Sequence, residues 1–224
     1  ILTLLLTGIL LHAEDWPQFL GPRRDGSYKG KELPLWPNEG PIKLWKKDIG
    51  AGFAGPAIAE EKLILFHRIN NRETVECLEA ATGKLIWSAD YVADYVDRFR
   101  FDNGPRAVPT IANGKVYTLG AHGIISAWDL KSGKVLWRVN ARVKFRADKG
   151  YFGFACSPLV FEGLVLLNIG GVDGSGVVGL DAITGQVRWS ATKDPANYAS
   201  PILTKFGGKA SALFFTRQGL VCLN

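Results

Sequence analysis

The sequence predicts an all-β protein, a β-propeller of four-stranded antiparallel blades in which about three to four blades are present and the ring is incomplete. Three observations carry this prediction. A turn pattern that ends in Trp recurs three times, a Pro-containing marker keeps the same period, and no window shows a sustained helical period. The 12 Phe, 7 Trp and 26 Gly also suit short strands and tight turns better than long helices.

The recurring turn consists of an acidic residue, two further residues, Thr or Ser, Gly, three residues and Trp. Its members are Glu79, Gly83 and Trp87; Asp129, Gly133 and Trp137; and Asp181, Gly185 and Trp189. The three Trp residues are 50 and 52 positions apart, and Trp45 precedes the first by 42. The acidic side chain can accept hydrogen bonds from the turn, and Gly tolerates the positive φ of a tight hairpin. The Trp supplies a flat apolar surface that can pack on the neighbouring unit.

The strands of each blade follow from these turns. In the second blade we expect strands at 110–111, 115–119, 124–128 and 135–137, with Asn113-Gly114 as the first hairpin turn. The third blade repeats the pattern at 164–168, 177–180 and 187–189, and the last 12 residues, 213–224, are expected to belong to a fourth. The Pro markers that precede the blades are Gly55-Pro56, Val108-Pro109, Ser157-Pro158 and Ser200-Pro201.

The N-terminal residues predict export from the cytoplasm. Residues 1–13 form an apolar run that ends at Ala13, which is typical of a truncated signal peptide and too short to span a bilayer. A buried first strand or helix is the alternative. We expect an extended lead-in over 14–41 and the partial propeller over 42–224. The predicted location is periplasmic or secreted, with no transmembrane span and no lipid-anchoring Cys after the apolar run.

Charge and cysteine content narrow the classes of partner. The net charge of +6 is modest: it suits an anionic ligand but does not indicate nucleic-acid binding. Three Cys do not form a disulfide framework. Cys77 and Cys222 share one position of the third strand with Ala127 and Gly179, so we expect both to be buried small residues. Cys156 precedes a blade and is expected to be more exposed.

The turn pattern resembles the tryptophan-docking motif of the PQQ-like repeat, which quinoprotein alcohol dehydrogenases share with the outer-membrane assembly lipoprotein BamB. Residues 15–26, Asp-Trp-Pro-Gln-Phe-Leu-Gly-Pro-Arg-Arg-Asp-Gly, are similar to the opening of a bacterial subset of BamB-like propellers. The resemblance covers about residues 15–224 and is far more specific for the repeat than for an activity. Quinoprotein dehydrogenases carry an adjacent Cys pair against the cofactor, and no such pair occurs in this sequence.

The resemblance implies a non-catalytic, BamB-like binding or scaffolding module outside the cytoplasm, with a protein or peptide partner in the cell envelope and no cofactor. A PQQ-dependent quinoprotein oxidoreductase and a carbohydrate-associated propeller are the alternatives. We expect no catalytic residue, because no nucleophile stands in a recognisable local signature. We also expect no metal, because His67 and His122 fall in different blades without a second ligand at metal spacing.

The long segments 88–108, 138–157 and 190–200 are predicted to share one face of the propeller, opposite the tight turns. Long loops on a rigid scaffold commonly carry binding sites, and the second segment is basic and rich in aromatic residues. Our candidates for ligand contact are Arg106, Arg146, Tyr151, Phe154, Asn197 and Tyr198. The alternative is a solvated loop with its aromatic side chains tucked between blades. The Gly-rich run 170–176 precedes a strand and not a helix, which favours a flexible loop over a phosphate site.

Overall fold

The computed structural model describes residues 14–30 and 35–224. The predicted signal peptide, residues 1–13, lies outside the described residues. Within them, no helix has the length and apolar character needed to cross a membrane.

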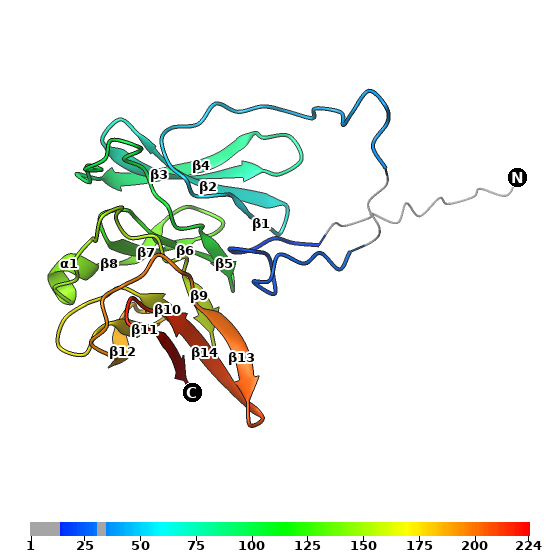
Figure 1. The fold of residues 1–224 in the computed structure, drawn as a ribbon. Coiled ribbons are helices and arrows are strands. Elements are labelled where there is room, and N and C mark those ends of the chain that lie inside the picture. Colours follow the sequence, from blue (N-terminus) through cyan, green and yellow to red (C-terminus); the bar gives the residue numbers. More distant parts are fainter. Residues whose placement is uncertain (1–13, 31–34) are drawn as a thin grey trace, which may run out of the picture.

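The described chain folds into four antiparallel sheets, each a meander of strands that follow one another in the sequence (Figure 1). The first sheet contains β1 (Ala57–Ala59), β2 (Lys62–Ile69), β3 (Arg72–Glu79) and β4 (Leu85–Val92). The second contains β5 (Thr110–Ala112), β6 (Lys115–Leu119), β7 (Ile124–Asp129) and β8 (Val135–Asn140). The third contains β9 (Leu159–Phe161), β10 (Leu164–Asn168), β11 (Val177–Asp181) and β12 (Val187–Ala191). The fourth contains β13 (Ile202–Phe206), β14 (Lys209–Phe215) and β15 (Leu220–Leu223).

The sheets are successive blades of a partial β-propeller, so the predicted fold class is confirmed. β6 and β10 have the predicted bounds, whereas the outer strands β8 and β12 run beyond Trp137 and Trp189, because their pairing with β7 and β11 continues past the Trp. One short helix was not predicted: α1 (Ala141–Lys144) follows β8. The Asn140 side chain caps it by accepting hydrogen bonds from the first-turn amides.

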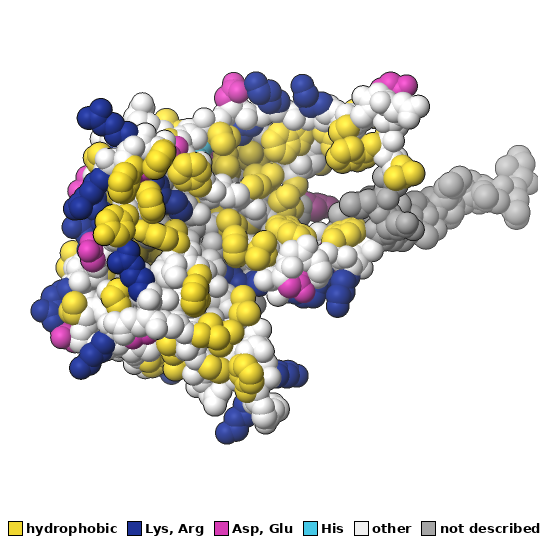
Figure 2. All heavy atoms as spheres, viewed as in Figure 1, with side chains coloured by type: hydrophobic (Ala, Val, Ile, Leu, Met, Phe, Trp, Pro, Cys, Tyr) yellow, Lys and Arg dark blue, Asp and Glu magenta, His cyan; other side chains and the backbone are white. Residues whose placement is uncertain are grey.

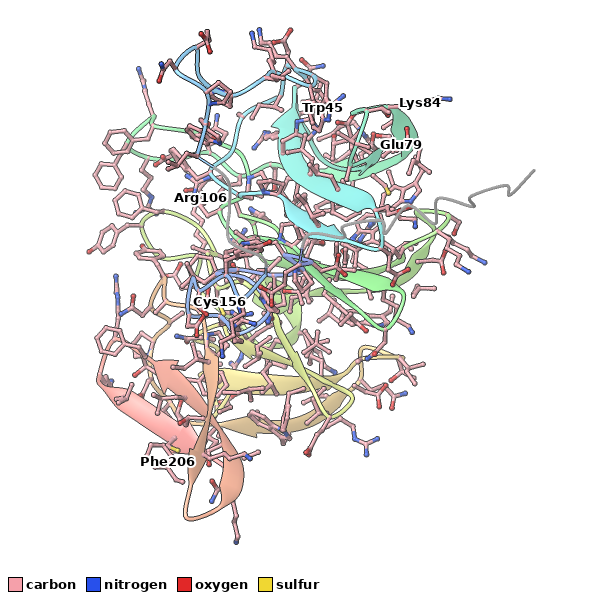
Figure 3. All side chains as sticks on the ribbon, turned by 90° about the vertical axis from the view of Figure 1, so that its right-hand side faces the viewer. Trp45, Glu79, Lys84, Arg106, Cys156 and Phe206 are labelled. Atoms are coloured by element: carbon pink, nitrogen blue, oxygen red, sulfur yellow. The ribbon has the colours of Figure 1, made fainter. Side chains whose placement is uncertain are left out.

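Three tryptophan side chains dock on the turn of the blade that follows them in the sequence. The indole Nε1 atoms of Trp45, Trp87 and Trp137 donate to the carbonyls of Ala80, Leu130 and Ala182 at 3.0, 2.9 and 3.1 Å. Each of these carbonyls lies in the docking turn of the following blade, and Figure 3 shows Trp45 beside the turn that carries Glu79 and Lys84. The ring covers the glycine of that turn. The repeated motif is therefore a seam contact between blades.

The hydrophobic core lies between the sheets, not within one of them. Alternate residues of β2 and β3, among them Phe66 and Val75, pack against Val116 and Trp128 of the second blade. A larger cluster joins the second blade to the third in the same way. Since strand side chains alternate between two faces, each blade buries one face against each neighbour. This stacking fixes where the connecting loops emerge.

The small residues of the third strand lie directly opposite a Trp. Cys77, Ala127 and Gly179 are the Cα partners of Trp87, Trp137 and Trp189, and an added Cβ at Gly179 would come within 2.4 Å of the Trp189 ring. Cys77 is buried, as predicted.

Two expectations about cysteine burial are wrong. Cys222 is exposed, because within residues 14–30 and 35–224 β15 pairs with β14 on one edge only. Cys156 is buried, since its Sγ accepts a hydrogen bond from the Asn168 amide at 3.3 Å inside the core of the second and third blades. In both cases the burial depends on neighbours that are distant in the sequence.

Candidate functional site

The three long inter-blade loops lie together on one face of the molecule. The Tyr198 hydroxyl, from the loop before β13, accepts hydrogen bonds from the backbone amides of Tyr151 and Phe152 at 3.1 and 3.2 Å. The Lys149 ammonium donates to the carbonyl of Val96 in the loop before β5, at 3.5 Å. Loops from three successive seams thus form a single surface.

An exposed group of aromatic side chains dominates this surface. We call it the aromatic platform, and its members are Phe99, Phe101, Tyr151, Phe152 and Tyr198. Neighbouring ring centroids lie 5.2–6.5 Å apart, within the range of favourable aromatic pairs. The five residues are between 37% and 71% exposed. Figure 2 shows hydrophobic side chains gathered among Lys and Arg side chains on the side of the molecule where α1 lies.

Cationic groups border the platform. The Arg217 guanidinium lies 5.4 Å from the centroid of the Tyr151 ring, and the Lys149 ammonium lies 4.9 Å from that of Tyr95. Arg98 and Arg100 alternate with the platform residues of the first loop and are exposed. A cation is attracted to the face of an aromatic ring. The surface therefore presents apolar area and positive charge side by side.

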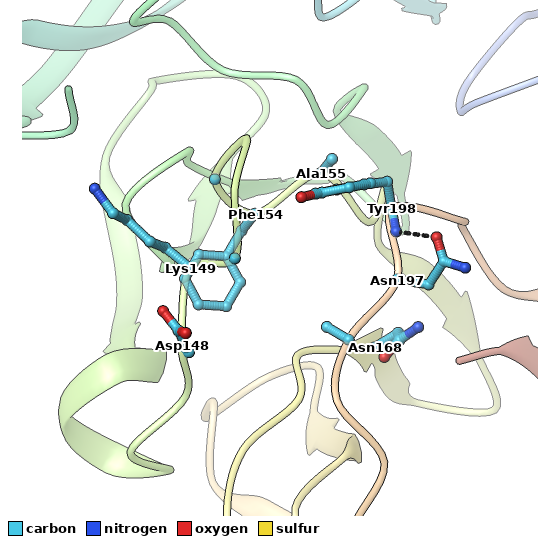
Figure 4. A pocket seen from close by; sticks show the side chains of 10 residues that line it. Asp148, Lys149, Phe154, Ala155, Asn168, Asn197 and Tyr198 are labelled. Carbon is cyan, nitrogen blue, oxygen red and sulfur yellow. Dashed lines mark hydrogen bonds between the residues drawn. The ribbon is translucent and has the colours of Figure 1, made fainter. Parts of the chain in front are cut away.

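A small cavity opens beside the platform, between the second and third loops (Figure 4). Phe154, Asn168, Asn197 and Tyr198 are among the residues that line it. Its volume of about 20 Å³ holds one water molecule but no larger ligand. The Asn168 side chain is buried and donates to the Phe215 carbonyl, while its Oδ1 atom has no protein partner. A water in the cavity would satisfy that oxygen.

An open groove of about 600 Å³ lies on the other side of the platform. Ala51 and Arg68 form one part of its lining, and the loop 96–103, which includes Phe101, forms the other. The groove therefore adjoins the aromatic platform at Phe101.

The Arg106 side chain is buried under the first loop and forms hydrogen bonds with its backbone. Its side chain is 8% exposed, stacks 4.8 Å from the centroid of the Tyr95 ring, and donates to the Asp102 carbonyl at 2.6 Å and to that of Gly104. It also forms an ion pair with Asp97 at 3.4 Å. Hydrogen bonds from the Phe99 and Asp102 amides, together with Arg106, lower the pKa of the Asp97 carboxyl. These contacts hold the loop that carries Phe99 and Phe101.

The residues predicted to contact a ligand lie in different parts of the loop face. Tyr151 and Tyr198 belong to the platform, and Asn197 lines the small cavity. Phe154 lines it too, but its ring is almost fully buried and packs over Gly123. Arg146 forms an ion pair with Asp173 of the Gly-rich loop 170–176.

Three members of the platform, Phe99, Phe101 and Phe152, were not among the predicted ligand contacts. Phe99 and Phe101 stand in the run Arg-Phe-Arg-Phe, in which cations and aromatic residues alternate within a long loop. That alternation is the signal that would have identified them.

The surroundings of the histidines fit structural roles. His67 is buried, its Nδ1 atom accepts a hydrogen bond from the Gly50 amide at 2.9 Å, and burial lowers its pKa. Burial likewise lowers the pKa of His122, which lies 3.1 Å from Asp94. Across residues 14–30 and 35–224, no group of three His, Cys, Asp or Glu side chains is placed to hold a metal ion.

Relatives of this chain fall into two groups. It is 29% identical over 189 residues to the dehydrogenase subunit of the quinone alcohol dehydrogenase of Gluconobacter oxydans, a match that covers 80% of this chain and 24% of the relative. It is 33% identical over 99 residues to the outer membrane protein assembly factor BamB of Xanthomonas campestris, covering 44% of this chain and 24% of that protein. The chain thus spans about a quarter of the length of these relatives.

Solved structures also align with part of this chain. The quinohemoprotein alcohol dehydrogenase ADHIIG of Pseudomonas putida aligns over 68% of this chain and 22% of its own, with 27% identity and a TM-score of 0.48. BamB of Moraxella catarrhalis aligns over 74% and 46%, with 20% identity and a TM-score of 0.47. The family model of the outer membrane protein assembly factor BamB matches residues 71–224, more than half of the sequence. The chain therefore belongs to the BamB family of PQQ-like-repeat β-propellers.

Proposed function

We propose that this protein is a non-catalytic binding or scaffolding propeller of the cell envelope, and that its loop face binds a polypeptide partner. The observation that carries the proposal is the aromatic platform. Five contiguous rings from three loops remain in contact with water, although burying them against a partner would be favourable. Aromatic residues and Arg are also the side chains most enriched at protein interfaces.

The shape of the loop face favours a polypeptide over a small molecule. Small-molecule sites are commonly concave cavities of about 300–1,000 Å³ that enclose most of the ligand. The cavity beside the platform is of the size of one water, and the larger groove is open and polar. A flat aromatic surface that continues into an open groove fits an extended or folded protein segment.

Enzymatic activity is the second candidate, because the chain resembles dehydrogenase subunits over 80% of its length. A PQQ-dependent oxidoreductase would also be exported to the periplasm. A carbohydrate-associated propeller is the third, since exposed aromatic rings can stack on sugars.

The main test removes two rings from the centre of the platform. We expect the double variant Phe99→Ala/Phe152→Ala to lose at least about tenfold in affinity for the partner, as central interface aromatics do. The control is Trp36→Ala/Phe206→Ala, which removes two rings that are 73% and 55% exposed outside the three loops. The partner is captured from an envelope extract with the wild-type protein, and its affinity for each variant is then measured by calorimetry.

Equal affinities of the two double variants would contradict the proposed face. A second arm addresses catalysis: the wild-type protein is supplied with PQQ and calcium and assayed for dye-linked alcohol oxidation. Turnover in that assay would overturn the non-catalytic function. Retention on an immobilised polysaccharide that depends on Phe99 and Phe152 would favour the carbohydrate alternative.

A further inference from the structure

We propose that residues 14–30 are a built-in peptide ligand, which occupies a peptide-binding site along the inner strands of the first three blades. The site would take an extended Trp-Pro segment followed by a buried arginine. This inference is independent of the loop-face function, and the segment lies outside the part of the chain, residues 71–224, that matches the BamB family model.

The inner strands offer unpaired backbone groups. β1, β5 and β9 are each the first strand of their sheet and pair with a neighbour on one side only. Free N–H and C=O groups at such an edge are a template for another extended segment. In Figure 1 the N-terminal segment runs beside β1 and β5.

The Trp-Pro pair occupies two of these edges. Trp16 pairs with Ile58, the middle residue of β1, through amide-to-carbonyl bonds of 2.8 and 2.9 Å in the two directions. The carbonyl of Pro17 then accepts a hydrogen bond of 2.7 Å from the amide of Ile111, the middle residue of β5. Pro has no N–H of its own, so it meets an edge without leaving a donor unpaired.

Arg24 reaches the third blade. Its guanidinium donates to the carbonyls of Ser157 and Pro158, immediately before β9, at 3.2 and 3.0 Å, and to the Gln18 side chain at 3.0 Å. Arg24 is only 5% exposed, and this burial lowers its pKa to about 10. A buried guanidinium with three acceptors is a specific contact, because its removal leaves the Gln18 side-chain oxygen and the Ser157 carbonyl without the Arg24 donor, while the Pro158 carbonyl keeps only the Thr110 hydroxyl.

The segment is shaped for this path by its own contacts. The turn that links Trp16 to Arg24 is closed by the bonds of the Gly21 amide to the Gln18 carbonyl and of the Gln18 amide group to the Pro22 carbonyl, at 3.0 and 3.1 Å. Gly21 has a φ of +78°, and a Cβ there would lie 2.9 Å from the Trp16 ring. The Trp, Pro, Gln, Gly and Arg of the sequence motif 15–26 thus each make a defined contact.

A charged clasp holds the two ends of the segment together. Arg23 donates to both carboxylate oxygens of Glu14, at 2.6 and 3.1 Å, and Glu14 also accepts from the Lys29 amide at 3.0 Å. The Arg23 hydrogen bonds and that amide lower the pKa of Glu14 to about 2. The geometry is that of a preorganised ligand, which loses little conformational freedom when it binds.

The first test supplies the segment in trans. The protein lacking residues 14–30 is mixed with a synthetic peptide of that sequence, and binding is measured by fluorescence anisotropy. We expect saturable binding, at least about tenfold weaker for the Arg24→Ala peptide and unchanged for the Lys29→Ala peptide, whose side chain makes none of the contacts described above. A folded deletion variant that ignores the peptide, or that binds all three equally, would overturn the proposal.

The second test uses the full chain, so that it decides the matter if the deletion variant does not fold. In Arg24→Ala we expect the amides of Ile58 and Ile111 to exchange with solvent at least about tenfold faster, while the amides of β10 keep their protection. The control is Arg72→Ala, which removes an exposed arginine paired with Asp90 on the first blade. Unchanged exchange at Ile58 and Ile111, or acceleration throughout the molecule, would contradict a separable ligand segment.

Discussion

One glycine in each docking turn meets two demands of different kinds. Gly83, Gly133 and Gly185 have φ values of +71°, +70° and +73°, which L-residues with a Cβ adopt at a cost. A Cβ at these positions would also lie 2.5–2.7 Å from the ring of Trp45, Trp87 or Trp137, respectively. The conformational demand was predicted from the sequence, whereas the close approach of the ring was visible only in the structure.

A matched pair of substitutions separates these two demands. Gly185→Ala introduces both the positive-φ strain and the clash with Trp137, whereas Gly163→Ala, with a φ of +76° and no atom within 4 Å, introduces only the strain. We expect Gly163→Ala to lower the free energy of unfolding by about 1 kcal/mol and Gly185→Ala by at least about twice as much. Urea denaturation of both variants measures the difference. Equal losses would mean that the Trp137 ring moves away without cost.

At the scale of the elements, the seam between the first and second blades contains a buried carboxylate. Glu73 of β3 is fully buried, accepts a hydrogen bond from the Tyr91 hydroxyl at 2.5 Å, and accepts another from the Ala121 amide of the second blade at 2.8 Å. Burial raises the pKa of Glu73, although these two hydrogen bonds and the nearby Arg68 and Arg106 act in the opposite direction. A second polar contact therefore links these two blades, in addition to the hydrogen bond from Trp87 to the Leu130 carbonyl.

The raised pKa gives this seam a pH dependence of defined sign. Folding favours the protonated Glu73, so its contribution is fully present below the unfolded pKa of 4.5 and is lost as the pH rises through the higher folded pKa. Glu73→Gln cannot ionise and keeps one acceptor for the Ala121 amide. We expect the stability of the wild type relative to this variant to fall between pH 4 and pH 8. Urea denaturation at several pH values measures it, and a constant or rising difference would contradict the raised pKa.

Elements whose limits are set by local turn chemistry could be predicted from the sequence. The Asn113-Gly114 turn immediately precedes β6, and the same pattern repeated in the third blade gave the bounds of β10 to the residue. The helix α1 could not be predicted, because four residues are too few to show a helical period.

Features that depend on distant neighbours could not be predicted in the same way. Cys156 accepts a hydrogen bond from a strand that begins eight residues later, and its neighbour Ser157 accepts one from Arg24 of the N-terminal segment. The aromatic platform depends on three loops that meet only when the blades have stacked. Tyr151 and Tyr198 were predicted from the sequence, but their neighbours Phe99, Phe101 and Phe152 were not. Sequence periodicity places the loops on a face but does not show which side chains meet there.

At the scale of the whole molecule, stability is shared between blades and the seams that join them. Each blade contacts its immediate neighbours, as in other repeat architectures. The loss of one seam therefore weakens the coupling between the blades on its two sides. Trp137 is the clearest single anchor: its side chain is 9% exposed, donates to Ala182 and lies near the Tyr117 ring in the core of the second and third blades.

Removal of that anchor has a large expected cost. We expect Trp137→Ala to lower the free energy of unfolding by about 3–5 kcal/mol, because it leaves a cavity in a packed seam. Trp36→Ala, at a position 73% exposed, is the control and should change stability by less than about 0.5 kcal/mol. Calorimetric melting of both variants measures the two effects. A negligible shift for Trp137→Ala would mean that the seam is not held by this residue.

The docking of each tryptophan on the following turn also gives the repeats a direction. Trp45 meets Gly83, Trp87 meets Gly133 and Trp137 meets Gly185, so the first and second blades each present a Trp donor on one side and an acceptor turn on the other. Units joined head to tail in this way are interchangeable at their junctions. Duplication or excision of one whole repeat in the gene would bring an equivalent donor to an equivalent acceptor. The number of repeats can therefore change during evolution without the invention of a new contact.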